Sequence, residues 1–144
     1  MKIRPLDKND IPFLVSARDS FSDAWDEKML VSAFNAGNFF GFIAEEIKDG
    51  KPAGFITYSV NIDTADMQDL FVAENYRRKG VGNALIEAFI KDAKSRGVKK
   101  LFLEVRESNT SAINLYKKAG FNLISVRNKY YSDGENALVL GKEL

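Results

Sequence analysis

The chain has 144 residues, a length typical of a single domain, and we expect one domain over residues 1–144. Its hydrophobic fraction of 45% is ordinary for a globular protein. Lys plus Arg number 21 and Asp plus Glu number 20, so the net charge of +1 argues against nucleic acid as a direct partner. The chain contains no cysteine and no histidine, which excludes disulfides, thiolate nucleophiles, Ser-His-Asp catalysis and metals held by those residues. Acid–base chemistry must therefore come from carboxylates, tyrosine, lysine, the N-terminus or water.

The distribution of apolar residues predicts a protein without a membrane anchor. No apolar run approaches the roughly 18–20 residues of a membrane span, and the first residues, M-K-I-R-P-L-D, lack the apolar segment of a signal peptide. The three prolines are scattered, and no repeat or low-complexity stretch divides the chain. We therefore expect one continuous cytoplasmic domain with no membrane partner.

The N-terminal part of the chain is predicted to form a strand followed by two helices. Residues 2–4 form the strand, and Asp7 or Asn9 can cap the helix that follows. The apolar face of this helix is expected to contain Ile11, Leu14, Val15 and Ala17. A second helix is expected to start at Asp26 and to end at a C-terminal cap near Gly37. Its apolar face is expected to contain Met29, Leu30, Ala33 and Phe34.

The rest of the chain alternates between strand and helix patterns. Residues 39–47, 55–61 and 67–72 are rich in aromatic and β-branched residues, and Asp49-Gly50 indicates a hairpin between the first two strands. A long helix over residues 80–96 has apolar residues at helical spacing, namely Val81, Leu85, Ala88, Phe89 and Ala93. A strand at 101–105, a helix at 110–119 and strands at 122–131 and 137–142 are expected after it. This order predicts an α/β fold with a mixed sheet and helices packed on it.

The motif R-R-K-G-V-G, residues 77–82, lies between a predicted strand and the long helix. Gly80 and Gly82 allow the backbone to approach a ligand closely, and the first turn of the helix offers unpaired N–H groups at the positive end of its dipole. Such a junction favours a pyrophosphate group. The alternative is a solvated basic turn, because the motif is neither a Walker loop nor a dinucleotide-binding G-x-G-x-x-G.

Two residues downstream are candidates for acid–base chemistry. Glu104 lies at the C-terminal end of a predicted strand and points away from the face that Leu103 and Val105 share. Tyr116 lies on the short helix and points partly inward, where a phenol can donate a proton to a basic leaving group. The alternatives are a surface charge for Glu104 and a half-buried packing residue for Tyr116.

These motifs together resemble those of the GNAT superfamily of N-acetyltransferases, in which Q/R-x-x-G-x-G/A is the acetyl-CoA loop. The later segments L-E-V-R-E-S-N, A-I-N-L-Y-K-K-A-G-F and V-R-N-K-Y-Y are similar to those of the ribosomal-protein alanine N-acetyltransferases of the RimI type. Residues 24–28, A-W-D-E-K, resemble the P-W-S-E segment of that branch. The resemblance covers nearly the whole chain and is strongest between residues 69 and 131. It implies a mostly antiparallel central sheet with splayed central strands, flanked by helices.

The resemblance also implies a role for each matching residue. It implies acetyl-CoA as the co-substrate, with direct transfer of the acetyl group and no metal. Glu104 is implied to be the general base, acting through water, and Tyr116 the general acid that protonates the departing thiolate. The implied cofactor-binding residues are Leu70, Phe71, Val72, Arg78, Lys79, Gly80, Val81, Gly82, Asn83, Asn109 and Tyr116. The implied acceptor-binding residues are Trp25, Asp69, Glu104 and Tyr131.

The implied acceptor is a protein N-terminus, including the N-terminal alanine of a ribosomal protein, and the enzyme is expected to be a monomer or homodimer. The chain departs from the family pattern on the acceptor side, since Asp69 stands where the family usually has Asn, Ala24 replaces a proline and Ser132 follows the tyrosine pair where proline is common. One alternative is an acetyltransferase for lysine, a polyamine or another small amine, and a second is an acyl-CoA-binding sensor without turnover. The α-amine is favoured because its pKa of ~7.7–8.0, against ~10.4 for lysine, leaves far more of it neutral near pH 7.

Overall fold

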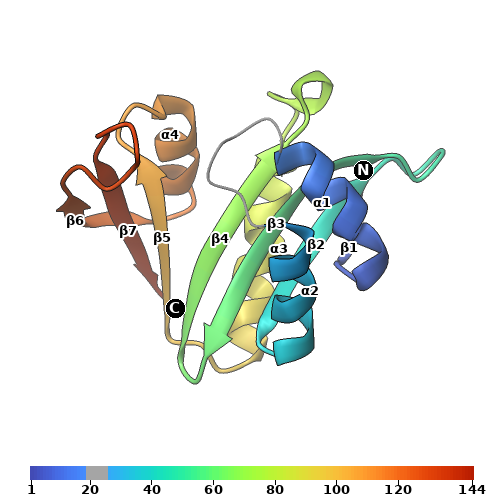
Figure 1. Cartoon of the computed structure of the whole chain (residues 1–144), viewed down its shortest axis with the longest axis horizontal. Helices are drawn as coiled ribbons and strands as arrows, with labels where there is room; N and C mark the ends of the chain where they lie inside the picture. The colour runs from blue at the N-terminus through green and yellow to red at the C-terminus, as the bar shows by residue number, and fades with distance from the viewer. Residues whose placement is uncertain (19–25) are drawn as a thin grey trace.

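The computed structural model describes residues 1–18 and 26–144, in which seven strands form one sheet in the order β1-β2-β3-β4-β5-β7-β6 (Figure 1). The strands are β1 (Lys2–Pro5), β2 (Phe39–Glu45), β3 (Pro52–Asn61), β4 (Thr64–Val72), β5 (Lys100–Arg106), β6 (Asn122–Arg127) and β7 (Ala137–Glu143). The helices are α1 (Ile11–Arg18), α2 (Glu27–Ala36), α3 (Val81–Ser95) and α4 (Thr110–Lys118), with short 3₁₀ turns η1 (Lys8–Asp10) and η2 (Glu74–Tyr76). The predicted mixed sheet with flanking helices is confirmed.

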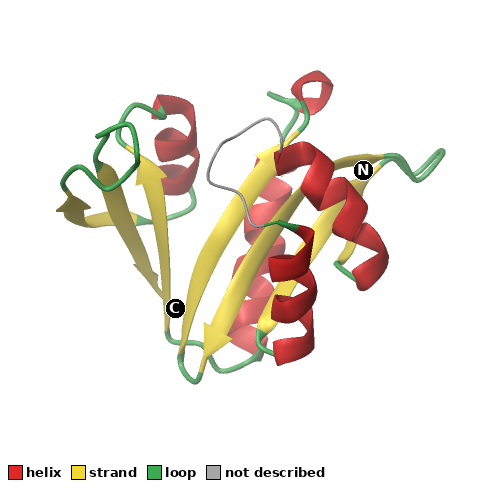
Figure 2. Ribbon diagram, in the orientation of Figure 1, coloured by secondary structure: helices red, strands yellow, loops and turns green. Residues whose placement is uncertain are grey.

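The helices cover both faces of the sheet. In Figure 2, α1 and α2 lie in front of the strands of the N-terminal half, and α3 lies behind them. The strand β3 contributes side chains to the cores on both faces of the sheet. Phe55 packs toward α1 and α2, whereas Ile56 and Tyr58 pack toward α3. Within the described ranges, none of the helices is both long and apolar enough to cross a membrane.

Local capping explains where the first helices begin and end. Asp7 accepts a hydrogen bond from the Asn9 N–H at 2.7 Å and opens η1, which leads directly into α1. Asp26 accepts from the Met29 N–H at 2.8 Å, and Gly37, with φ of 83°, ends α2 in the left-handed conformation. The prediction that Met29 faces the core is wrong, because its side chain is 49% exposed. The buried stripe of α2 is narrow and centres on Leu30, one helical step of about 100° away from Met29.

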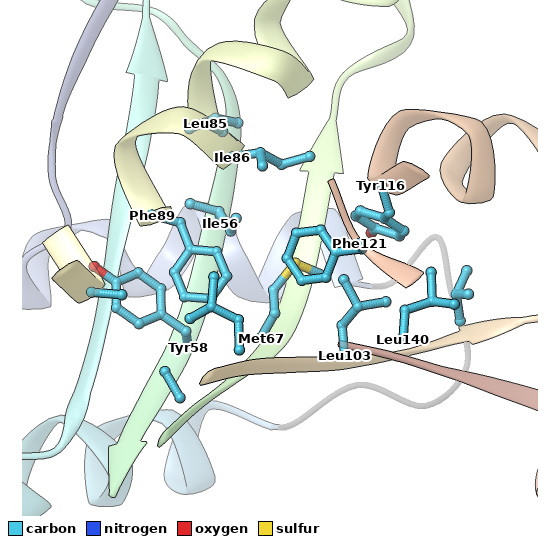
Figure 3. Packing of buried hydrophobic residues seen from close by; sticks show 14 of the residues in the cluster. Ile56, Tyr58, Met67, Leu85, Ile86, Phe89, Leu103, Tyr116, Phe121 and Leu140 are labelled. Carbon is cyan, nitrogen blue, oxygen red and sulfur yellow. The ribbon is translucent and has the colours of Figure 1, made fainter. Parts of the chain in front are cut away.

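The larger core lies between α3 and the sheet and continues under α4 (Figure 3). Leu85 and Phe89 of α3 contribute to it at the helical spacing that the sequence predicts, and Ile86, which was not predicted, lies with them. It receives Leu103 from β5 and Leu140 from β7, so the same core joins both halves of the sheet. Full burial of each such side chain stabilises the fold by about 1.5–3 kcal/mol.

The centre of the sheet is splayed. The strands β4 and β5 are the one parallel pair among the described strands, and their pairing is limited to Thr64–Asp66 with Lys100–Phe102. Beyond this contact the two strands diverge, as Figure 1 shows. A bulge accompanies the divergence, because Thr57 pairs with Asp69 and Tyr58 with Met67, which leaves Gln68 as an extra residue in β4. A bulge bends its strand and increases its twist, so it helps to turn β4 away from β5.

The final predicted hairpin is shorter than expected. The strand β6 ends at Arg127 rather than at residue 131, and Lys129 has a positive φ of 52°. The side chain of Asn136 accepts a hydrogen bond from the Lys129 N–H at 2.9 Å, which stabilises this turn. The tyrosine pair that follows therefore lies in the loop before β7 rather than in a strand.

Candidate active site

A cavity of about 1340 Å³ lies in the wedge between β4 and β5. It is also lined by the start of α3, by α4, and by the loop between β6 and β7. Thirteen of the predicted site residues line it together: Asp69, Leu70, Phe71, Val72, Arg78, Gly80, Val81, Gly82, Asn83, Glu104, Asn109, Tyr116 and Tyr131. Lys79 is exposed and does not line this cavity, and Trp25 lies outside the described residues.

The first turn of α3 forms one end of the cavity. Gly80 caps the helix in the left-handed conformation, with φ of 82° and no side-chain cap, so the N–H groups of the first turn remain available to a ligand. Arg77 donates from Nε to the carbonyl oxygen of Val72 at 2.9 Å, which fixes the loop to the end of β4. A Cβ atom at Gly82 would lie 3.1 Å from Leu115 Cδ2, so glycine allows α3 to lie close to α4. The roles of Arg77 and Leu115 depend on tertiary contacts that the sequence motif does not contain.

The edge of β4 forms the floor of the cavity. Residues 70–72 pair with residues 54–56 of β3, and the pairing of β4 with β5 stops at Asp66. The backbone of residues 70–72 therefore runs along the wedge, where an extended ligand that carries amides can bind as an additional strand does.

Glu104 lies on the opposite wall of the wedge. The prediction for its orientation is confirmed, because Leu103 and Val105 are buried in the core while the Glu104 side chain is 31% exposed toward the cavity. Its Oε1 atom lies 3.1 Å from Nε of Arg127 on β6. Asp66 lines the same cavity, and burial, with the nearby Glu104 charge as a second cause, raises the pKa of Asp66 above its usual range. Sequence reasoning missed both Asp66 and Arg127 as site residues.

Tyr116 reaches the cavity from α4 and is 5% exposed. Its ring packs edge-on against Phe121, with the ring centroids 6.1 Å apart. Figure 3 shows the two side chains in the core. Burial raises the pKa of the Tyr116 phenol well above its usual value, and the charges of Asp69 and Tyr131 raise it further. The hydroxyl therefore keeps its proton at neutral pH.

An ion-pair network holds the loop between β6 and β7. Arg106 Nη1 lies 2.8 Å from Asp133 and 2.9 Å from Glu135, and its guanidinium group lies 4.0 Å from the centre of the Tyr131 ring. Hydrogen bonds from Ser108 and then from Arg106 lower the pKa of Glu135. This network positions Tyr131 at the rim of the cavity.

Asn109 has a structural role in addition to its position at the cavity. Its Oδ1 atom accepts a hydrogen bond from the Ala112 N–H at 3.2 Å and caps α4. Because Tyr116 lies two turns further along α4, the cap also determines where the phenol enters the cavity.

Comparison with known proteins agrees with this geometry. Residues 11–121 match the Acetyltransferase (GNAT) family. The chain is 39% identical over 120 residues to the ribosomal protein bS18-alanine N-acetyltransferase of Escherichia coli K12, covering 81% of this chain and 78% of the relative. It is 37% identical over 116 residues to an N-alpha-acetyltransferase of Sulfurisphaera tokodaii, covering 72% of this chain and 68% of the relative.

Solved structures give the same result. The crystal structure of the Escherichia coli ribosomal-protein-S18-alanine N-acetyltransferase superposes with a TM-score of 0.88 at 34% identity, covering 99% of this chain and 92% of that chain. Arabidopsis thaliana NAA60 in complex with acetyl-CoA has a TM-score of 0.86 at 19% identity over 99% of this chain and 98% of that chain, which is a likeness of fold. The chain therefore belongs to the GNAT family of acetyltransferases, as its motifs predict. It is an N-acetyltransferase with relatives of the RimI type.

Proposed function

We propose that this enzyme transfers the acetyl group of acetyl-CoA directly to the N-terminal α-amine of a protein, and that the N-terminal alanine of a ribosomal protein is its acceptor. The observation that carries the proposal is one cavity lined by a helix N-terminus, the end of strand β4, a buried phenol and a carboxylate. The names of the relatives, which include bS18-alanine and N-alpha-acetyltransferases, support the choice of acceptor.

The residues at the α3 end of the cavity fit the pyrophosphate of acetyl-CoA. The first-turn N–H groups of residues 81–83 point along the helix axis toward the positive end of its dipole, and Arg78 adds a full charge. The backbone of residues 70–72 lines the cavity and fits the amide-bearing arm, and Asn109 also lines the cavity. A cavity of about 1340 Å³ exceeds the ~300–1,000 Å³ of a drug-sized site, which suits a long cofactor together with an acceptor peptide.

Glu104 and Tyr116 supply the acid–base chemistry on the two sides of the transferred group. Glu104 accepts a proton from the acceptor ammonium, through water, so that the neutral amine can form a bond with the acetyl carbon. The nitrogen then releases its second proton to water and the carbon–sulfur bond breaks, while Tyr116 donates its proton to the departing thiolate and regains one from solvent. The low-dielectric environment that raises the pKa of the phenol also destabilises a thiolate beside it, so burial opposes ionisation of both partners.

The acceptor side of the cavity favours a cationic amine. Three carboxylates face it, those of Asp66, Asp69 and Glu104, against two arginines that are already paired, Arg106 with Asp133 and Glu135 and Arg127 with Glu104. Before it reacts, the amine must lose one proton. The pKa of that proton is ordinarily ~7.7–8.0 for an α-amine and ~10.4 for a lysine. One carboxylate acting through water is an adequate base for the α-amine.

The test uses mass spectrometry to compare the acetylation of two peptides that differ in which amine is free. In the first, the N-terminal alanine is free and the lysine side chain is blocked. In the second, the N-terminus is blocked and one internal lysine is free. We expect the α-amine to react faster near pH 7, in line with a neutral fraction that is roughly two orders of magnitude larger. Preference for the lysine peptide would support the lysine acetyltransferase instead. Binding of acetyl-CoA without release of CoA in the presence of either peptide would support the acyl-CoA-binding sensor.

The pH–rate profile of Glu104→Gln tests the base. The variant keeps the size of the side chain, so we expect acetyl-CoA to bind as it does to the parent. Its rate should fall at neutral pH, and the loss should shrink at high pH, where the α-amine is already neutral. Identical profiles for the parent and the variant would remove Glu104 from the mechanism.

A further inference from the structure

Arg127 reaches Glu104 across an intervening strand. Glu104 of β5 pairs with Val139 of β7, which pairs in turn with Ser125 of β6. Arg127 lies two residues beyond Ser125 and therefore on the same face of the sheet. Its side chain extends back over β7, and its Nε atom lies 3.1 Å from Glu104 Oε1. Both residues line the cavity, so the contact is made inside the proposed acceptor site.

A second carboxylate lies on the same face as Glu104. Asp66 pairs with Phe102 at the vertex of the wedge, and Glu104 follows Phe102 by two residues, so all three point to the same side of the sheet. The like charges of Asp66 and Glu104 repel each other, and the repulsion contributes to the raised pKa of Asp66. Arg127 provides the compensating positive charge next to Glu104.

The ion pair has little value as a stabilising contact. The Arg127 side chain is 55% exposed, and exposed ion pairs contribute little to folding because water screens them and two long side chains must be ordered. The guanidinium group lies 5.7 Å from the centre of the Tyr130 ring, which limits the directions that it can take. Because the ion pair between Arg127 and Glu104 adds little stability, its presence beside the proposed base is better explained by a role in orienting the Glu104 carboxylate.

We propose that Arg127 is a positioning residue that holds the Glu104 carboxylate by Oε1 and turns Oε2 toward the acceptor amine or the water that deprotonates it. The inference rests on the proposed role of Glu104 as the base. Without Arg127, the carboxylate rotates freely and is repelled by Asp66, so fewer molecules have the base in the productive orientation.

The first test is the Arg127→Gln variant, with kcat and both KM values measured on the N-terminal alanine peptide. We expect kcat to fall about tenfold, because loss of orientation reduces the rate of the chemical step. KM for acetyl-CoA should stay within about twofold, because Arg127 lies on the acceptor side. Arg127→Lys should recover part of the rate. The matched control is Arg96→Gln, which breaks an ion pair of 2.8 Å with Asp92 on α3, away from the cavity, and should leave kcat unchanged.

A double-mutant cycle with Glu104→Gln decides whether Arg127 acts through Glu104. We expect Arg127→Gln to cause no further loss of kcat once Glu104 is replaced. Two outcomes overturn the role of Arg127 and leave the proposed base in place. In the first, Arg127→Gln lowers kcat equally in the parent and in Glu104→Gln. In the second, Arg127→Gln has the parent kcat while Glu104→Gln is slow. A parent rate for Glu104→Gln alone overturns the proposed base, and the positioning role with it.

Discussion

Tyr116 is a buried packing residue for which we also propose a role in the chemistry. Its ring fills the core beside Phe121, and its hydroxyl group is at the cavity. Burial keeps the phenol protonated, and Asp69 adds to this effect. Because the family pattern usually has Asn at the position of Asp69, the carboxylate makes the phenol of this enzyme a weaker acid than an amide neighbour would.

The Tyr116→Phe variant separates the two roles of this residue. The ring remains, so we expect stability and acetyl-CoA affinity close to those of the parent, whereas kcat should fall by roughly 10²–10⁴-fold, the usual contribution of a general acid. Steady-state kinetics under conditions where chemistry limits turnover measures the change. Tyr58→Phe is the matched control, because Tyr58 is also buried but donates its hydrogen bond to Asp92 on the α3 side. A loss of less than about threefold would make Tyr116 a packing residue.

At the scale of elements, the first turn of α3 forms the proposed pyrophosphate site. A Cβ at Gly82 meets Leu115, so a larger side chain there must displace a cavity-lining residue or enter the cavity. The Gly82→Val variant should therefore lose at least about tenfold in affinity for CoA, which corresponds to roughly 1.4 kcal/mol, measured by calorimetry. Gly82→Ala adds only the Cβ, which a small movement of Leu115 can accommodate, and should retain most of the affinity. Unchanged affinity of Gly82→Val would contradict the proposed pyrophosphate site.

The sequence predicts the features that depend on neighbours within a few residues. The caps at Asp26 and Gly37 and the outward direction of Glu104 follow from local hydrogen bonding and from alternation along a strand. The ion pair of Glu104 with Arg127 could not be predicted, because it depends on the register of three strands. The end of β6 was missed for a similar reason, since a side chain from Asn136 stabilises the turn at Lys129.

At the scale of the whole molecule, two buried phenols make the fold sensitive to alkali. Tyr58 lies under α3 and Tyr116 lies on the buried face of α4, and burial raises the pKa of each above the value of about 10 that holds in the unfolded chain. The folded state therefore holds these protons more tightly than the unfolded state does. The stability that they contribute is fully present below pH ~10 and is lost as the pH rises above it, by about 1.4 kcal/mol per pH unit for each group.

An alkaline titration tests this expectation when tyrosinate absorbance and circular dichroism are recorded together. Of the five tyrosines, Tyr58 and Tyr116 should ionise only in the cooperative step in which the secondary structure is lost. The Tyr58→Phe variant should show one tyrosinate fewer in that step and a weaker fall of stability with pH. Ionisation of all five tyrosines near pH 10 with unchanged dichroism would show that neither phenol is protected.

The short contact between β4 and β5 has a consequence for the lifetime of the enzyme. Three residue pairs join the two strands, so the halves of the sheet depend on the shared core beneath them to stay together. At the proposed donor site, CoA or acetyl-CoA would contact β4, α3 and α4 at once and bind only the folded chain, which adds about 2.7 kcal/mol of stability at a concentration 100-fold above its dissociation constant. We therefore expect the resistance of the enzyme to proteolysis to rise with the concentration of CoA or acetyl-CoA.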